Sequence, residues 1–118
     1  MRLMKFVGLM VGCALVASLP LRAAEVTVKG EVVDQACYLK DKSKGADHKD
    51  CGMGCVKKGQ AAAIVTAEGD VYTLAGSYTE NKNAKLVDLV AKMVEAKGEV
   101  TEKGGKKILT ATSIHEAK

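Results

Sequence analysis

Five segments with the apolar pattern of β-strands constrain the fold of this chain most strongly. They cover residues 25–34, 62–66, 71–74, 93–101 and 107–114. Glu68-Gly69-Asp70 offers a tight turn between the second and third segments, and Glu102-Lys-Gly-Gly105 offers one between the last two. Apolar and polar residues alternate early in the first segment, as they do in a strand with one buried face. The sequence therefore predicts a mainly β domain of five strands.

The segment between the third and fourth strands has the pattern of an amphipathic helix. Asn83 is expected to cap a helix over residues 84–93, in which four apolar side chains share one face: Leu86, Leu89, Val90 and Met93. This order of elements is that of a small OB-like barrel, the oligonucleotide/oligosaccharide-binding shape. Gly30 and Gly98, inside the first and fourth strands, suit the sharp coiling of such a barrel. An open α+β sheet is the alternative fold.

The strands also supply a candidate hydrophobic core. We expect the barrel, together with Leu86, Leu89 and Val90, to provide most of the folding energy. The strand positions expected in the core are Val26, Val28, Ile64, Val71, Leu74, Val100, Ile108 and Ile114.

A segment rich in cysteine and histidine follows the first strand. This insertion covers about residues 37–59 and contains Cys37, His48, Cys51 and Cys55. Residues 46–58 could form a short helix capped by Asp47. On that helix the histidine and the last two cysteines, spaced three and four residues apart, share one face. Cys37 lies where the first strand ends and could close on that face.

Four sulfur and nitrogen donors in this arrangement suit a tetrahedral metal site. The sequence predicts a Cys3His site, most naturally for zinc and alternatively for Cu(I), with four ligands: Cys37, His48, Cys51 and Cys55. Two other interpretations remain open, because one disulfide could staple the insertion to the barrel, or a thiol could take part in thiol–disulfide exchange. The chain has no Cys-x2-Cys-His motif, so no covalent haem is expected.

Other candidate residues carry weaker signals. Glu31 and Asp34 lie three residues apart on a strand, which puts them on opposite faces and argues against a carboxylate pair. Met53 lies on the opposite side of the expected helix from the cysteines, so we expect it to pack and not to bind metal. His115 is expected at the surface. Nothing except the thiols indicates an enzyme.

The first residues have the pattern of a secretory signal peptide. Basic residues precede an apolar run over residues 6–19, Pro20 follows, and the small residues Ala23 and Ala24 permit cleavage. The run is too short to span a bilayer, which needs roughly 20 apolar residues. We therefore expect a cleavable signal peptide over residues 1–23 and a single periplasmic or secreted domain over residues 24–118, without stable membrane insertion. Cys13 leaves a lipoprotein as a minor alternative.

The charge of the mature chain argues against nucleic acid as a partner. Without Arg2, Lys5 and Arg22, 15 basic and 14 acidic residues remain, which gives a net charge of +1. Only three tyrosines supply aromatic rings in this part of the chain. Nucleic-acid binding needs a basic surface and rings on which bases can stack, so we do not expect it.

Several motifs together resemble a group of small exported bacterial proteins of largely unknown function. They begin with Val32-Val-Asp34-Gln-Ala-Cys37 and His48-x2-Cys51-x3-Cys55-Val-Lys-Lys-Gly59. Ile64-Val-Thr-x2-Gly69-x-Val71-Tyr-x-Leu74 and Lys97-Gly98-Glu-Val-Thr continue the likeness, which covers most of the mature chain. The resemblance implies a small OB-like barrel and carries no activity with it.

The sequence thus predicts a small periplasmic binding module whose Cys/His cluster coordinates zinc or copper. The expected partner is the metal ion or a periplasmic protein. A thiol-redox protein is one alternative, and a structural or partner-binding barrel with a disulfide-held insertion is the other.

Overall fold

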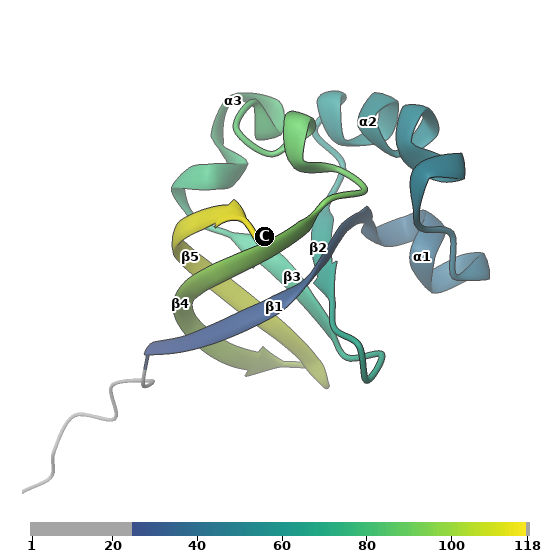
Figure 1. Ribbon diagram of the computed structural model, residues 1–118. Coiled ribbons are helices and arrows are strands. Elements are labelled where there is room, and N and C mark those ends of the chain that lie inside the picture. Colours follow the sequence, from purple (N-terminus) through teal and green to yellow (C-terminus); the bar gives the residue numbers. More distant parts are fainter. Residues whose placement is uncertain (1–24, 118) are drawn as a thin grey trace, which may run out of the picture.

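Five strands form the body of the protein in a computed structural model that describes residues 25–117. The predicted signal peptide lies outside these residues. The strands pair in the order β1-β2-β3-β5-β4 and close into a barrel (Figure 1). Their bounds are β1 (Glu25–Asp34), β2 (Ala62–Val65), β3 (Val71–Ala75), β4 (Met93–Lys103) and β5 (Lys106–Glu116). The predicted five-stranded β domain is confirmed, and the closure excludes the open sheet.

The first strand belongs to two sides of the barrel. Residues 25–31 pair with β4 and residues 31–34 pair with β2, so β1 changes partner at Glu31. A Cβ atom on Gly30 would collide with the backbone carbonyl of Val65, and one on Gly98 would collide with the carbonyl oxygen of Thr110. Glycine at these two positions therefore allows the close strand approach that the coiled sheet requires, as the sequence predicted.

The barrel interior holds the main hydrophobic core. Val28, Ile64, Leu74 and Ile114 are buried there as predicted, and Val26 and Val100 pack against them. Ile108 was a wrong prediction, because the fully buried residue is its neighbour Leu109. Lys97 pairs with Ser113 while Gly98 pairs with Ala111, so β5 carries one extra residue at this irregularity. The extra residue reverses which side chains point inward on either side of it.

The segment between β3 and β4 differs from the predicted helix over residues 84–93. It contains three short elements, namely η2 (Ser77–Thr79), α3 (Glu80–Asn83) and η3 (Val87–Leu89). Residues 81–83 adopt positive φ angles, which interrupt a regular helix. Asn83 does not cap a helix, because its buried amide donates hydrogen bonds to the carbonyl oxygens of Val56 (3.0 Å) and Gln60 (2.8 Å).

The apolar residues of this segment only partly follow the predicted pattern. Leu86 and Val90 are buried in the barrel core, and Leu89 packs against it while partly exposed. Met93 is exposed because it already belongs to β4. The helical spacing therefore identified two core residues although the regular helix does not form.

A helical insertion follows β1 as predicted, but in place of one helix over residues 46–58 it contains α1 (Gln35–Asp41), η1 (Ala46–His48) and α2 (Lys49–Lys57). Asp47 caps neither η1 nor α2. The N-cap residue is Gly45 for η1 and His48 for α2, and no side-chain hydrogen bond caps either element. Val56 of α2 is buried in the barrel core, whereas Tyr38 of α1 packs with Val33 and Val65 in a second cluster outside it. Helices α2 and α3 lie at one end of the barrel (Figure 1).

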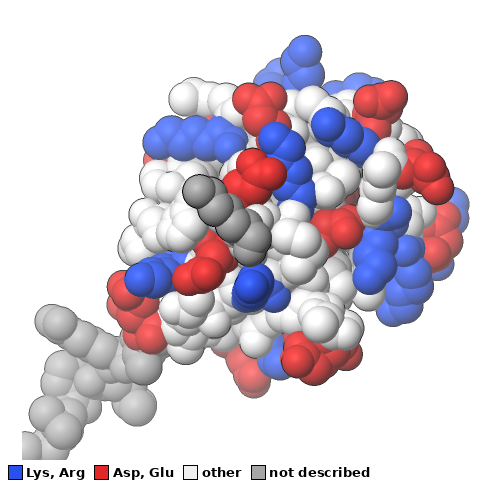
Figure 2. Space-filling model, in the orientation of Figure 1, with Lys and Arg blue, Asp and Glu red and all other residues white. Residues whose placement is uncertain are grey.

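Charged side chains of both signs are intermingled on the face shown in Figure 2. Two exposed ion pairs, Lys92–Glu116 and Lys107–Asp70, have separations of 3.9 and 3.7 Å. Such pairs contribute little to stability. Among the described residues, no helix has the length and apolar character needed to cross a membrane.

We predict that Leu86→Ala lowers the free energy of unfolding by about 2–5 kcal/mol, because the side chain is 0% exposed in the barrel core. Leu89→Ala should cost less, since Leu89 is only partly buried. Chemical denaturation of the two variants and the unchanged protein measures the difference. A larger loss for Leu89→Ala would contradict the packing described above.

Candidate metal centre

Asp34 is a fully buried carboxylate at the end of β1. It follows Val28 and Val32 at even spacing, and these residues point into the barrel, so its side chain is also directed inward. Asp34 is 0% exposed, and neither carboxylate oxygen has a hydrogen-bond partner of regular geometry within residues 25–117. A buried carboxylate without a donor costs several kcal/mol or is compensated by a bound group. Asp34 therefore marks a candidate site.

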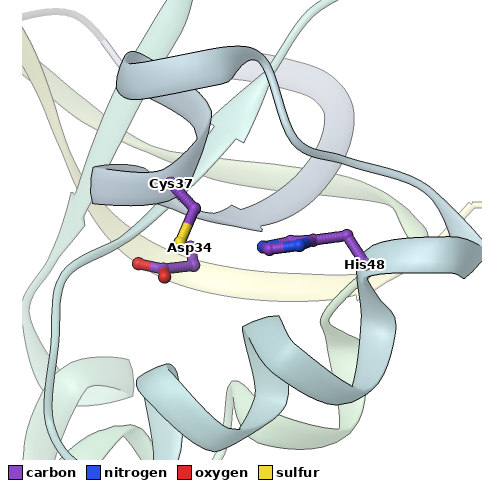
Figure 3. Close-up of side chains that lie close together, drawn as sticks. All are labelled: Asp34, Cys37 and His48. Atoms are coloured by element: carbon purple, nitrogen blue, oxygen red, sulfur yellow. The ribbon is translucent and has the colours of Figure 1, made fainter.

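Cys37 and His48 place a sulfur and a nitrogen donor beside this carboxylate. Helix α1 begins directly after Asp34 and directs Cys37 toward it, while the His48 ring approaches from the junction of η1 and α2 (Figure 3). The three ligand atoms all lie within 4.8 Å of one another. His48 Nε2 is buried and has no partner in the described part of the chain. Asp34, Cys37 and His48 therefore form a group that could hold a metal ion.

The separation of these donors is close to that of a tetrahedral zinc site. Zinc bonds of about 2.0–2.3 Å place neighbouring ligand atoms roughly 3.3–3.8 Å apart. The observed group lies within 4.8 Å, so closure around an ion needs shifts of about 1 Å. Small rotations of the three side chains are sufficient for such shifts.

Gly52 of α2 lies against Val90 and the His48 ring. A Cβ atom on Gly52 would lie 3.0 Å from Val90 Cγ1 and 3.5 Å from His48 Cδ2. A Cβ atom here would therefore crowd Val90 in the core, while it would make only ordinary van der Waals contact with the imidazole. Glycine lowers helix stability by about 1 kcal/mol relative to alanine, and at this position it permits the close packing between α2, Val90 and the candidate ligand.

Asp34 also governs the two partly exposed thiols. The hydrogen-bonding interaction with Asp34 is the largest cause that raises the pKa of Cys37 to about 12, followed by desolvation and by the charges of Asp34, Cys55 and Cys51. The pKa of Cys55 is raised for the same first two reasons. In the metal-free protein both thiols are therefore protonated at neutral pH. Thiolates are the reactive form, so this environment does not favour thiol–disulfide exchange.

Two of the four predicted ligands lie in the Asp34 group, and a third interacts with its carboxylate. Cys37 and His48 belong to the Asp34 group, and Cys55 interacts with the same carboxylate. Cys51 is exposed and is not in the group, although its charge contributes to the raised pKa of both other thiols. That these four residues bind a metal together stays a prediction.

The insertion is held without a disulfide in the described residues. Cys37, Cys51 and Cys55 are all free thiols. The Thr73 hydroxyl donates a hydrogen bond of 2.5 Å to the Gln35 side chain, and the Gly45 amide donates one of 2.6 Å to the Glu31 carboxylate. These contacts and the burial of Val56 and Tyr38 fix the insertion against the barrel, so the proposed staple is absent.

Sequence reasoning missed Asp34 as a candidate ligand. It correctly separated Asp34 from Glu31, which lies partly exposed on the other face. The alternation along the strand could have identified Asp34, because it lies at even spacing from Val32 and from Val28, which was expected in the core. It also precedes Cys37 by only three residues. Met53 packs against the core and His115 is exposed, as predicted.

Comparisons of the chain with known proteins identified no relative. No family model matches the chain, and no similar curated protein or solved structure was found.

Replacement of Asp34 tests the origin of the raised thiol pKa values. In metal-free protein, Asp34→Asn should lower the pKa of Cys37 and Cys55, because the carboxylate is the main cause of both shifts. More thiolate then forms at pH 8, so iodoacetamide should modify Cys37 faster than in the unchanged protein. Mass spectrometry of the alkylated peptides measures the rates between pH 7 and pH 10.

Asp41→Asn is the matched control, since Asp41 is an exposed acidic residue of α1 that is not among the main causes of either raised thiol pKa. It should leave the alkylation rates unchanged. Equal rates for Cys37 in Asp34→Asn and in the unchanged protein would contradict the assigned cause.

Proposed function

We propose that this protein is a metal-binding module and that its centre consists of Asp34, Cys37, His48 and Cys55. The observation that supports this most strongly is the enclosed Asp34 carboxylate, which has no hydrogen-bond partner of regular geometry within residues 25–117. A cation bound between Asp34, Cys37 and His48 would compensate this charge and also satisfy the buried His48 Nε2. Cys55 is the natural fourth ligand because it adjoins the same carboxylate.

The donor set favours zinc over Cu(I). One carboxylate oxygen, one imidazole nitrogen and two thiolates suit the borderline Zn²⁺ ion, which accepts all three kinds of donor in tetrahedral sites. Cu(I) prefers thiolate and thioether ligands, and a carboxylate contributes little to its binding. We therefore infer that zinc is the preferred ion and that Cu(I) binds more weakly to this donor set.

Three further inferences complete the proposed identity. The closed five-stranded sheet and the position of the insertion support an OB-like barrel. The apolar run over residues 6–19 supports export by a cleavable signal peptide, and thus a periplasmic or secreted module. The resemblance to small exported bacterial proteins agrees with both inferences.

Titration of zinc into reduced protein tests the proposed centre. Asp34→Asn, Cys37→Ser and His48→Ala should each weaken zinc binding by at least about a hundredfold, which exceeds the effect of losing an outer-shell partner. Affinity should also fall as pH is lowered, because Cys37 and Cys55 must lose protons that Asp34 helps them to keep. Calorimetry at pH 6, 7 and 8 measures both effects.

His115→Ala is the matched control, because His115 is exposed on β5 and is not part of the group. It should bind zinc as tightly as the unchanged protein. Equal affinity for His48→Ala and the unchanged protein, or Cu(I) binding that is insensitive to Asp34→Asn and tighter than zinc binding, would contradict the proposed centre.

We further predict that Asp34→Asn stabilises the metal-free protein while it removes zinc binding. The amide has nearly the same shape as the carboxylate and carries no charge, so the cost of burying it is smaller. The free energy of unfolding should rise by roughly 1 kcal/mol or more. Denaturation in the presence of a chelator measures this change, and a clear loss of stability would show that the carboxylate has a structural partner.

A further inference from the structure

Cys51 is the exposed cysteine of the helix that also carries Cys55. It is exposed, whereas Cys37, His48 and Cys55 are partly buried and Asp34 is fully buried. On α2 it follows His48 by three residues and precedes Cys55 by four, so all three share one helix face. Its charge acts on both Cys37 and Cys55. The donors therefore form a graded series from the surface to the enclosed carboxylate.

A buried site of this kind needs a route by which the ion reaches it. Asp34 is 0% exposed, so an ion must pass other side chains of the insertion to reach its carboxylate. Cys51 is a fifth donor that a four-coordinate ion does not require. A donor in excess of the coordination number, placed on the solvent side, is suited to transient binding.

We propose that Cys51 is a gateway ligand that exchanges the metal with an external carrier whose own donor is a thiolate. This inference rests on the proposed function and adds a partner class to it. The carrier is expected to use sulfur because it must compete with the two thiolates of the centre for the same borderline ion. A small thiol and a cysteine-containing protein share this chemistry.

The exchange proceeds by replacement of one bond at a time. Cys51 loses its proton to water and bonds to the ion, while the bond between the ion and the carrier sulfur breaks and that sulfur takes up a proton. Cys37 or Cys55 then loses a proton and bonds to the ion, and Cys51 is released and protonated again. Asp34, His48 and the other thiolate each replace one remaining donor of the carrier, or one water, in the same way. Each step forms one metal–donor bond and breaks one, and no electrons are transferred.

Alkylation of the zinc-loaded protein tests the resting position of Cys51. With zinc bound, iodoacetamide should modify Cys51 while Cys37 and Cys55 are protected. Peptide mass spectrometry identifies the modified residues. Equal protection of all three cysteines would overturn the proposal, because Cys51 would then be an ordinary ligand of the bound ion.

Transfer kinetics test the exchange itself. Zinc-loaded protein is mixed with an excess of free cysteine or of a peptide that contains a Cys-x2-Cys pair, and loss of zinc is followed in time. Cys51→Ser should slow transfer to both acceptors by at least about tenfold, while the equilibrium affinity changes by less than about threefold. The ratio of the transfer rate of the unchanged protein to that of Cys51→Ser is compared for the two acceptors. A larger ratio with the peptide would identify a protein carrier, and equal ratios would identify a small thiol.

Lys49→Ser is the matched control, because Lys49 is also exposed on α2 but points away from the cysteine face. It should exchange zinc at the unchanged rate. If Cys51→Ser loses affinity as strongly as Cys37→Ser, or leaves the transfer rate unchanged, the gateway role is wrong while the metal centre stands. Absence of zinc binding by the unchanged protein would instead overturn the proposed function together with the gateway.

Discussion

The enclosed Asp34 carboxylate has no hydrogen-bond partner of regular geometry among residues 25–117, and its burial raises the free energy of the metal-free fold. Asp34 raises the pKa of Cys37 and Cys55 and thereby keeps both thiols protonated. It also lies beside the unpartnered His48 Nε2. A bound cation would reverse each of these effects at once, because it would neutralise the carboxylate, favour the thiolates and accept the imidazole lone pair. The Asp34 carboxylate therefore affects the two thiols and the imidazole of the insertion together.

The position of that charge follows from the path of β1. The strand passes from β4 to β2 at Glu31, next to the close contact that Gly30 permits, and it ends at an inward position. The chain leaves the barrel at this residue and enters α1, which returns Cys37 to the strand end. Helix α2 then covers the opening because Val56 is buried in the barrel core. The barrel thus holds Asp34 rigidly, and the insertion brings the softer donors to it.

Sequence reasoning identified the strands and the insertion because both have strong local patterns, and it failed where distant contacts decide the structure. Ile108 was placed in the core because nothing local reveals the extra residue in β5 that puts Leu109 there. Asn83 was read as a cap, yet its amide satisfies two carbonyl groups near the end of α2. The spacing of His48, Cys51 and Cys55 predicted a shared face but could not rank their distance from Asp34, which depends on how α2 packs.

Metal binding would change the energetic balance of the insertion. An unsatisfied buried polar group costs about 1–3 kcal/mol and more when charged, while a ligand present at a hundred times its Kd stabilises the folded state by about 2.7 kcal/mol. These magnitudes are similar, so a moderately bound ion suffices to offset the cost of burying Asp34. The ion would also connect the end of β1 to α1 and α2, in addition to the hydrogen bonds that join Gln35 to Thr73 and Gly45 to Glu31. An apolar residue at this inward position would give a more stable empty barrel, so the proposed metal site gives the acidic residue there a role.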